Sequence, residues 1–263
     1  LGKELTGGAE QQAYEIARRL TNAGVQLEVL TSCGRSFHHD WNEDYHPAGL
    51  RDEEGLAVRR FPVNPVRPTR FGYVVEEMLA LPRERLRPGL FPLSPQHEDI
   101  YWKEGMSSPA LLQYLADQQE NYSHFLFLPY LFPLIEQGIR AVGKRAILQP
   151  CLHDEPYAYL RRSHQMMLRC GSLFFNSYGE QELAAEIYGD WIHEKATLIG
   201  EGVEARFDLD QANPLPDTPY LLYLGKKCPE KNTPFLLEAF KQFKASYPQS
   251  PLKLVIAGVG ELA

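Results

Sequence analysis

A regular alternation of strand-like and helix-like segments between residues 107 and 199 limits the folds open to this chain. Ser107, Ser108 and Pro109 begin the series, because serine caps the free amides of a helix start and proline suits the first helical position. The segments that follow the helix at 109–119 are strands at 124–129, 145–149, 172–177 and 196–199, and helices at 131–142, 156–169 and 179–188. Strands separated by helices in this way form parallel sheets covered by helices on both faces. The pattern therefore predicts a parallel α/β domain.

The first hundred residues extend this domain less regularly. Apolar residues recur at helical spacing after Gly8, and this predicted helix ends at Gly24. The segment at 25–31 then has the composition of a buried strand. A second strand is predicted at 56–63, whereas the residues between these two strands are polar and irregular. The proline-rich stretch that follows has few clear periods, and one helix is predicted there at 71–81.

A second alternation begins after residue 218, with a strand at 220–224, a helix at 233–243 and a strand at 252–257. The predicted organisation is therefore a Rossmann-like domain over 1–200, a linker over 201–218, and the start of a second Rossmann-like domain over 219–263. Because the second alternation is short and the chain begins at Leu1, we expect residues to be missing at both ends.

Composition narrows the range of partners. The 263 residues are 44% hydrophobic and carry a net charge of -7, from 27 basic and 34 acidic side chains. A general nucleic-acid binder needs a basic surface, so that class is disfavoured, although a local basic pocket for phosphate is not. The four cysteines form no C-x-x-C pair, which argues against a zinc site and favours reduced thiols in a cytosolic protein. The most apolar run, 125–135, has about half the length of a membrane helix and contains two prolines.

Gly7 and Gly8 stand directly before the first predicted helix. Glycines allow a ligand to approach the backbone closely, and the free amides and dipole of a helix start favour an anion. A glycine pair at this position is also ordinary turn chemistry. A phosphate-binding loop and a simple turn therefore both remain open.

A basic turn, Gly225-Lys226-Lys227-Cys228-Pro229-Glu230-Lys231-Asn232, follows the strand at 220–224 and precedes a helix. Ligands of open parallel sheets bind at the carboxyl ends of strands, and lysines there can neutralise a diphosphate. A solvated basic turn is the alternative.

His153-Asp154-Glu155 follows another predicted strand, at 145–149. A histidine at this edge can donate a hydrogen bond to a substrate hydroxyl or phosphate. For the two acids we favour a structural role as first-turn carboxylates that stabilise a helix start.

Two further clusters contain acidic or histidine side chains and are candidate metal sites. His38-His39-Asp40 lies in a predicted loop, where adjacent histidines seldom aim at one ion. Asp208-Leu209-Asp210 has the form of a metal-holding carboxylate pair, but it lies in the predicted linker. We therefore expect no metal at either cluster.

Several motifs together resemble, in order and spacing, a glycosyltransferase of family 4 with the GT-B fold, of a bacterial subgroup. The matching stretches are Gly7-Gly8-Ala9-Glu10, the segment at 31–63, His153-Asp154, Gly200-Glu201-Gly202-Val203-Glu204 with Phe207, Tyr223-Leu224-Gly225-Lys226 with Pro229-Glu230-Lys231-Asn232, and 254–260. Lys226 stands where the family has arginine, and Glu201 where asparagine is common. The family's paired-glutamate motif would lie beyond Ala263, and its first strand before Gly7.

The resemblance implies retaining transfer of a sugar from a UDP- or GDP-sugar to an acceptor hydroxyl, in polysaccharide or glycolipid biosynthesis, with no metal and no further cofactor. The implied fold is α/β and GT-B-like, with two Rossmann-like domains, the acceptor on the first and the donor mainly on the second. The implied catalytic residues are His153, Lys226 and Lys231. The implied donor-binding residues are Gly7, Gly8, Gly202, Gly225, Lys226, Lys231, Gly258 and Gly260.

Three other functions remain open at this point. A nucleotide-sugar epimerase and a non-catalytic nucleotide-sugar-binding protein could share the GT-B fold, and a metal hydrolase could use His38, His39, Asp40 and His153. The expected location is cytoplasmic. Peripheral contact with the inner face of the membrane is open, because Arg83, Arg85 and Arg87 lie near Leu79, Leu81 and Leu86, but we favour an ordinary surface turn.

Overall fold

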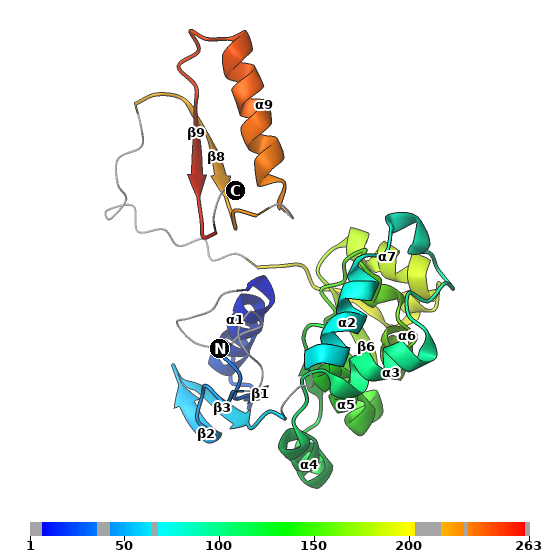
Figure 1. Cartoon of the computed structure of the whole chain (residues 1–263). Coiled ribbons are helices and arrows are strands. Elements are labelled where there is room, and N and C mark those ends of the chain that lie inside the picture. The colour runs from blue at the N-terminus through cyan, green and yellow to red at the C-terminus, as the bar shows by residue number, and fades with distance from the viewer. Residues whose placement is uncertain (1–6, 36–42, 65–67, 203–216, 229–230, 261–263) are drawn as a thin grey trace. The chain divides into compact units, whose positions relative to one another are not determined.

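The computed structural model describes residues 7–35, 43–64, 68–202, 217–228 and 231–260 (Figure 1). The chain divides into two compact units, residues 1–202 (unit 1) and residues 203–263 (unit 2). Each unit contains parallel strands joined by helices. The predicted α/β class with Rossmann-like parallel sheets is therefore confirmed, whereas the GT-B arrangement stays a prediction.

The amino-terminal part of unit 1 holds a three-stranded sheet. β1 (Glu28–Ser32) pairs in parallel with β3 (Leu56–Phe61), in a register that sets Val29 opposite Val58, and β2 (Gly49–Glu53) pairs with β3 in antiparallel fashion. α1 (Gly8–Asn22) buries Ala17 against Leu56 and Val58. The sequence predicted both parallel strands and this helix.

A second sheet of unit 1 is wholly parallel. Its order is β4 (Phe125–Phe127), β5 (Ala146–Leu148), β6 (Ser172–Phe175) and β7 (Ala196–Leu198). The connections contain α5 (Pro133–Val142), α6 (Arg161–Arg169) and α7 (Tyr178–Tyr188). Since parallel crossovers are right-handed and the strand order advances in one direction, these three helices lie on one face of the sheet.

Three more helices of at least ten residues are not separated by strands: α2 (Pro68–Leu79), α3 (Pro95–Glu104) and α4 (Pro109–Gln118). The predicted serine cap of α4 is confirmed, because the Ser108 hydroxyl accepts a 3.3 Å hydrogen bond from the Leu111 amide. A single helix over 156–169 was predicted, and this is wrong. Leu160 is extended (φ -68, ψ 145), and it separates the 3-10 helix η4 (Pro156–Tyr159) from α6.

The core of unit 1 is continuous from α2 to the four-stranded sheet. Its most completely buried side chains include Trp102, Tyr130, Phe175, Leu148, Leu173 and Met166. Short elements complete the unit: α8 (Ile192–Lys195) and the 3-10 helices η1 (Arg83–Arg85), η2 (Gln119–Asn121) and η3 (Gly143–Arg145). All four cysteines, at 33, 151, 170 and 228, are free thiols.

The basic, apolar edge that the sequence leaves open around residues 79–87 is small in the structure. Leu86 is buried in the core, and Arg83 forms an ion pair with Asp154. Leu79, Arg85 and Arg87 remain exposed. Within the part of the chain that the structure describes, no helix combines the length and the apolar character needed to cross a bilayer.

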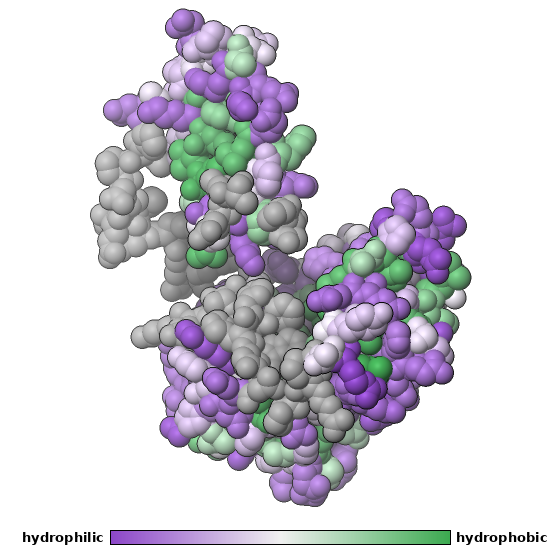
Figure 2. Space-filling model, in the orientation of Figure 1, coloured by the Kyte–Doolittle hydropathy of each residue, from purple (hydrophilic) through white to green (hydrophobic). Residues whose placement is uncertain are grey.

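Unit 2 contains one strand–helix–strand motif. β8 (Tyr220–Leu224) and β9 (Lys253–Ala257) pair in parallel, with Leu222 opposite Val255, and α9 (Thr233–Ser246) connects them. The sequence predicted all three elements to within three residues at each end. Figure 2 shows apolar side chains along this motif; Leu222, Leu224 and Phe235 are exposed.

Candidate functional site

A polar cluster joins α1 to the carboxyl edge of the four-stranded sheet. Gln149 and Asn176 are the residues directly after β5 and β6, and the Gln149 Nε2 donates to the Asn176 Oδ1 at 2.7 Å. The Gln12 side chain, in the second turn of α1, donates to the same oxygen at 2.9 Å. The helix start at Gly8 and the loop after β5 are therefore held at one edge of the sheet, where ligands of open α/β sheets bind.

Cys151 belongs to this cluster and has a left-handed backbone, with φ 53°. Its Sγ lies 3.5 Å from the Gln12 Oε1 and 3.8 Å from the Asn176 Nδ2. Burial raises the pKa of this thiol to about 11, so the sulfur is protonated at neutral pH and acts as a hydrogen-bonding group rather than a nucleophile. The Gln149 Oε1 is buried and has no hydrogen-bond partner among the described side chains.

The start of α1 lacks a side-chain cap, and Gly7 before it is extended (φ -126, ψ 155). Among the described residues, a Cβ added to Gly8 would meet nothing within 4 Å, and one added to Gly7 would meet the flexible carboxylate of Glu10. Packing against the described residues requires neither glycine, and the Glu10 carboxylate lies against Gly7 at this helix start.

His153 is exposed at the same edge, two residues after Cys151. Burial raises the pKa of the Glu155 and Glu180 carboxyl groups, and hydrogen bonds to each carboxylate, followed by electrostatic attraction to His153, offset part of that rise. Glu180 accepts hydrogen bonds from the Leu152 amide at 2.7 Å and the Asn176 amide at 2.6 Å, which fixes the loop before His153.

Asp154 and Glu155 are held by structural partners. Asp154 binds Arg83 and accepts a hydrogen bond from the Tyr159 hydroxyl at 2.8 Å, and Glu155 accepts one from Tyr130 at 3.0 Å. Their role is thus structural, as favoured from the sequence, but it comes from side-chain contacts and not from a long helix start.

Unit 2 presents its lysines on the turn between β8 and α9. Lys226 and Lys231 are exposed, and neither has an ion-pair partner among the described residues. Thr233, which is 1% exposed, closes the turn: its hydroxyl accepts from the Cys228 amide at 2.8 Å and donates to the Cys228 carbonyl at 2.6 Å. Sequence reasoning missed Thr233, although a threonine that opens a helix after a turn is a usable signal.

Gly258 and Gly260, predicted to bind the donor, have a clear packing role. Gly258 has φ +135, and a Cβ there would lie 1.9 Å from the Gly225 carbonyl oxygen. Gly260 has φ +100, and its Cβ would lie 2.4 Å from the Lys227 carbonyl oxygen. The loop after β9 thereby packs backbone to backbone on the lysine turn, with a 2.7 Å hydrogen bond from the Lys227 amide to the Val259 carbonyl.

Replacing Gly258 with alanine is expected to loosen the lysine turn, at a cost of about 1–3 kcal/mol, because a strained φ and a backbone clash arise together. Faster hydrogen exchange at the amides of β8 and β9 would show the loss. Val259→Ala is the matched control, since that side chain is 74% exposed. Equal exchange in the two variants would contradict the packing role.

The remaining predicted positions are less constrained. Gly225 donates its amide to the Ala257 carbonyl at 3.0 Å, and Gly202 has nothing within 4 Å of an added Cβ. The clusters at 38–40 and 208–210 lie outside the described residues. Within the described ranges, no group of three histidine, cysteine, aspartate or glutamate side chains could hold a metal ion.

Each unit therefore gathers part of the predicted set at a strand end. Unit 1 brings Gly7, Gly8 and His153 to one sheet edge, and unit 2 brings Lys226 and Lys231 to one turn. A scan against models of known protein families and a search of curated proteins found no match to this chain.

Proposed function

We propose that the protein is a retaining glycosyltransferase that uses a UDP- or GDP-sugar and acts in polysaccharide or glycolipid biosynthesis. The observation that carries the proposal is the turn after β8. It lies at the carboxyl end of a parallel strand, it is fixed by Thr233 and by Gly258, and it exposes Lys226 and Lys231 without ion-pair partners in the described structure. Lysines exposed at the carboxyl end of a parallel strand suit a diphosphate.

In this proposal the two lysines act on the leaving group. When the glycosidic bond to the donor breaks, negative charge grows on the diphosphate. Cations held beside it stabilise the transition state more than the ground state, which is the condition for catalysis. The diphosphate oxygen receives the proton of the acceptor hydroxyl as the new bond forms on the same face, so no side-chain nucleophile is needed.

Unit 1 supplies the complementary groups in the proposal. The amides after Gly7 would bind an anionic or hydroxyl group, and the exposed His153 would position the sugar or the leaving group. Cys151, Gln12 and Asn176 would hold this loop in place and take no part in bond making.

The test is a transfer assay on the full-length protein with a panel of UDP- and GDP-sugars and saccharide or lipid-linked acceptors. The expected result is release of nucleoside diphosphate that depends on the acceptor and resists chelators, with the anomeric configuration retained by NMR. Free sugar or an epimer formed without acceptor would identify the epimerase alternative. Tight binding without turnover would identify a binding protein, and loss of activity with a chelator would favour a metal hydrolase.

A further inference from the structure

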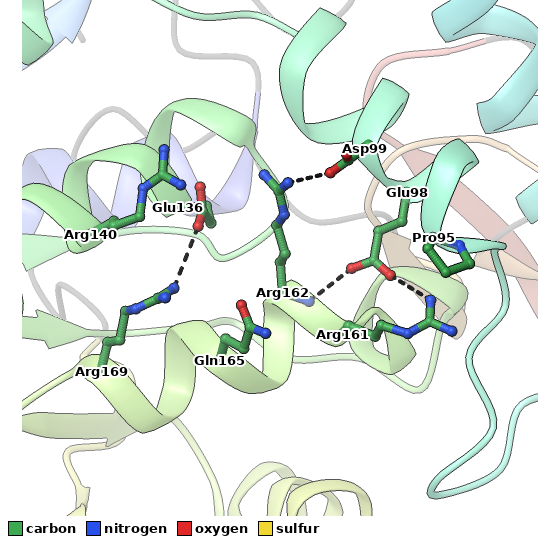
Figure 3. Close-up of a pocket in the computed structure, with 9 residues that line it drawn as sticks. All are labelled: Pro95, Glu98, Asp99, Glu136, Arg140, Arg161, Arg162, Gln165 and Arg169. Carbon is green, nitrogen blue, oxygen red and sulfur yellow. Dashed lines mark hydrogen bonds and ion pairs between the residues drawn. The ribbon is translucent and has the colours of Figure 1, made fainter.

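A groove between α3, α5 and α6 of unit 1 forms a cavity of about 320 Å³ (Figure 3). Four of the nine residues that line it are arginines. The groove is built on helix faces, and it shares no residue with the strand-end cluster or with the lysine turn. Its volume lies at the lower end of the range for small-molecule sites.

In one half of the groove, the charged side chains already have hydrogen-bond or ion-pair partners. Glu98 is 3% exposed and accepts hydrogen bonds from the Arg161 guanidinium at 3.1 Å, the Arg162 amide at 2.8 Å and the Trp102 indole at 3.3 Å. The Arg162 guanidinium binds Asp99. These groups already have partners and demand no ligand.

In the other half of the groove, a buried carboxylate oxygen has no hydrogen-bond donor. Glu136, on α5, is 2% exposed, and its Oε2 is buried with no hydrogen-bond partner among the described residues. Its Oε1 has an ion pair with Arg169 of α6, but the 3.7 Å separation is too long for a hydrogen bond. A buried carboxylate that accepts no hydrogen bond is costly, and native structures normally supply a donor.

Unused cations lie beside this carboxylate. Arg140, one turn after Glu136 on α5, is exposed and has no ion-pair partner in the described part of the chain, and Arg169 has only its long contact (Figure 3). Gln165, also on the groove wall, adds a side-chain amide. The site thus offers two guanidinium groups to an anion and one carboxylate to a hydrogen-bond donor.

We propose that the groove binds a phosphorylated sugar. A phosphate shares its oxygens between two guanidinium groups, which recognise it through paired hydrogen bonds. The sugar hydroxyls donate to the Glu136 carboxylate, which would instead repel a bare phosphate dianion. This site is separate from the proposed transfer reaction, and its occupancy does not require that proposal to hold.

Isothermal titration of the full-length protein with glucose 6-phosphate, glucose 1-phosphate, glucose and inorganic phosphate tests the site. At least one sugar phosphate is expected to bind about tenfold or more tightly than inorganic phosphate or glucose, because it uses both the arginines and Glu136. Binding of neither sugar phosphate, or binding of inorganic phosphate with equal affinity, would overturn the proposal.

Three variants locate the binding. Arg140→Gln is expected to weaken binding of the sugar phosphate about tenfold or more. Glu136→Met, which keeps the side-chain size, should abolish the preference for sugar phosphate over inorganic phosphate. Arg85→Gln, an exposed arginine of η1 outside the groove, is the matched control and should leave binding unchanged. Equal effects of Arg140→Gln and Arg85→Gln would overturn the assignment.

Discussion

Replacing Lys231 with alanine in the full-length protein is expected to lower kcat/KM for sugar transfer by about 30- to 900-fold, or about 2–4 kcal/mol, as loss of one oxyanion donor does elsewhere. The lysine is exposed on a turn whose backbone is fixed by contacts that its side chain does not make. Its amide donates to the Cys228 carbonyl at 3.1 Å, and Thr233 closes the turn independently. The variant should therefore fold normally, and the loss should appear in kcat.

Lys241→Ala is the matched control for this prediction. Lys241 lies on α9 of the same unit, its side chain is 79% exposed, and it has only a 3.5 Å ion pair with Glu238. Lys226→Arg adds a second comparison, because a guanidinium keeps the charge and adds a paired hydrogen bond to a phosphate. If the kcat/KM of the Lys231→Ala protein lies within threefold of the wild-type value, in an assay where the wild type transfers sugar, the proposed role of this lysine is rejected.

The parallel strands of this protein could be predicted because each is a short apolar run bounded by turn residues. β5 and β6 bury Leu148 and Leu173 completely, and such positions leave a clear pattern. β2 could not be predicted, since four of its five residues are exposed and it is a polar strand at the sheet edge. The helix α3 was missed for a related reason: its residues are mostly polar, and its buried Glu98 hides the apolar face.

Candidate functional residues were predictable only where their neighbours in the chain form a strand or helix that the sequence reveals. The glycine pair, the lysine turn and His153 each stand next to a strand or helix that the sequence reveals. The cluster of Gln12, Cys151 and Asn176 could not be predicted, because its members are 139 and 164 residues from Gln12 and no single segment is unusual. The arginine groove likewise depends on how three helices pack.

Trp102→Ala is expected to lower the free energy of unfolding of unit 1 by about 3–5 kcal/mol, because it leaves a large cavity in the core. Trp102 is 1% exposed, and its ring meets that of Tyr101 edge to face with centroids 4.9 Å apart. Urea unfolding followed by circular dichroism measures the change. Tyr178→Ala, at a position 72% exposed, should change the stability by no more than about 0.5 kcal/mol.

Trp102→Phe separates packing from hydrogen bonding at this position. Phenylalanine fills much of the space but cannot donate to Glu98, so we expect a smaller loss of about 1–2 kcal/mol. Glu98 also orients Arg161 and the start of α6, through hydrogen bonds that do not involve Trp102. The same substitution should therefore weaken sugar-phosphate binding in the groove only slightly. A loss of stability in Trp102→Phe equal to that in Trp102→Ala would show that the indole hydrogen bond, and not the volume of the ring, holds α3 in place.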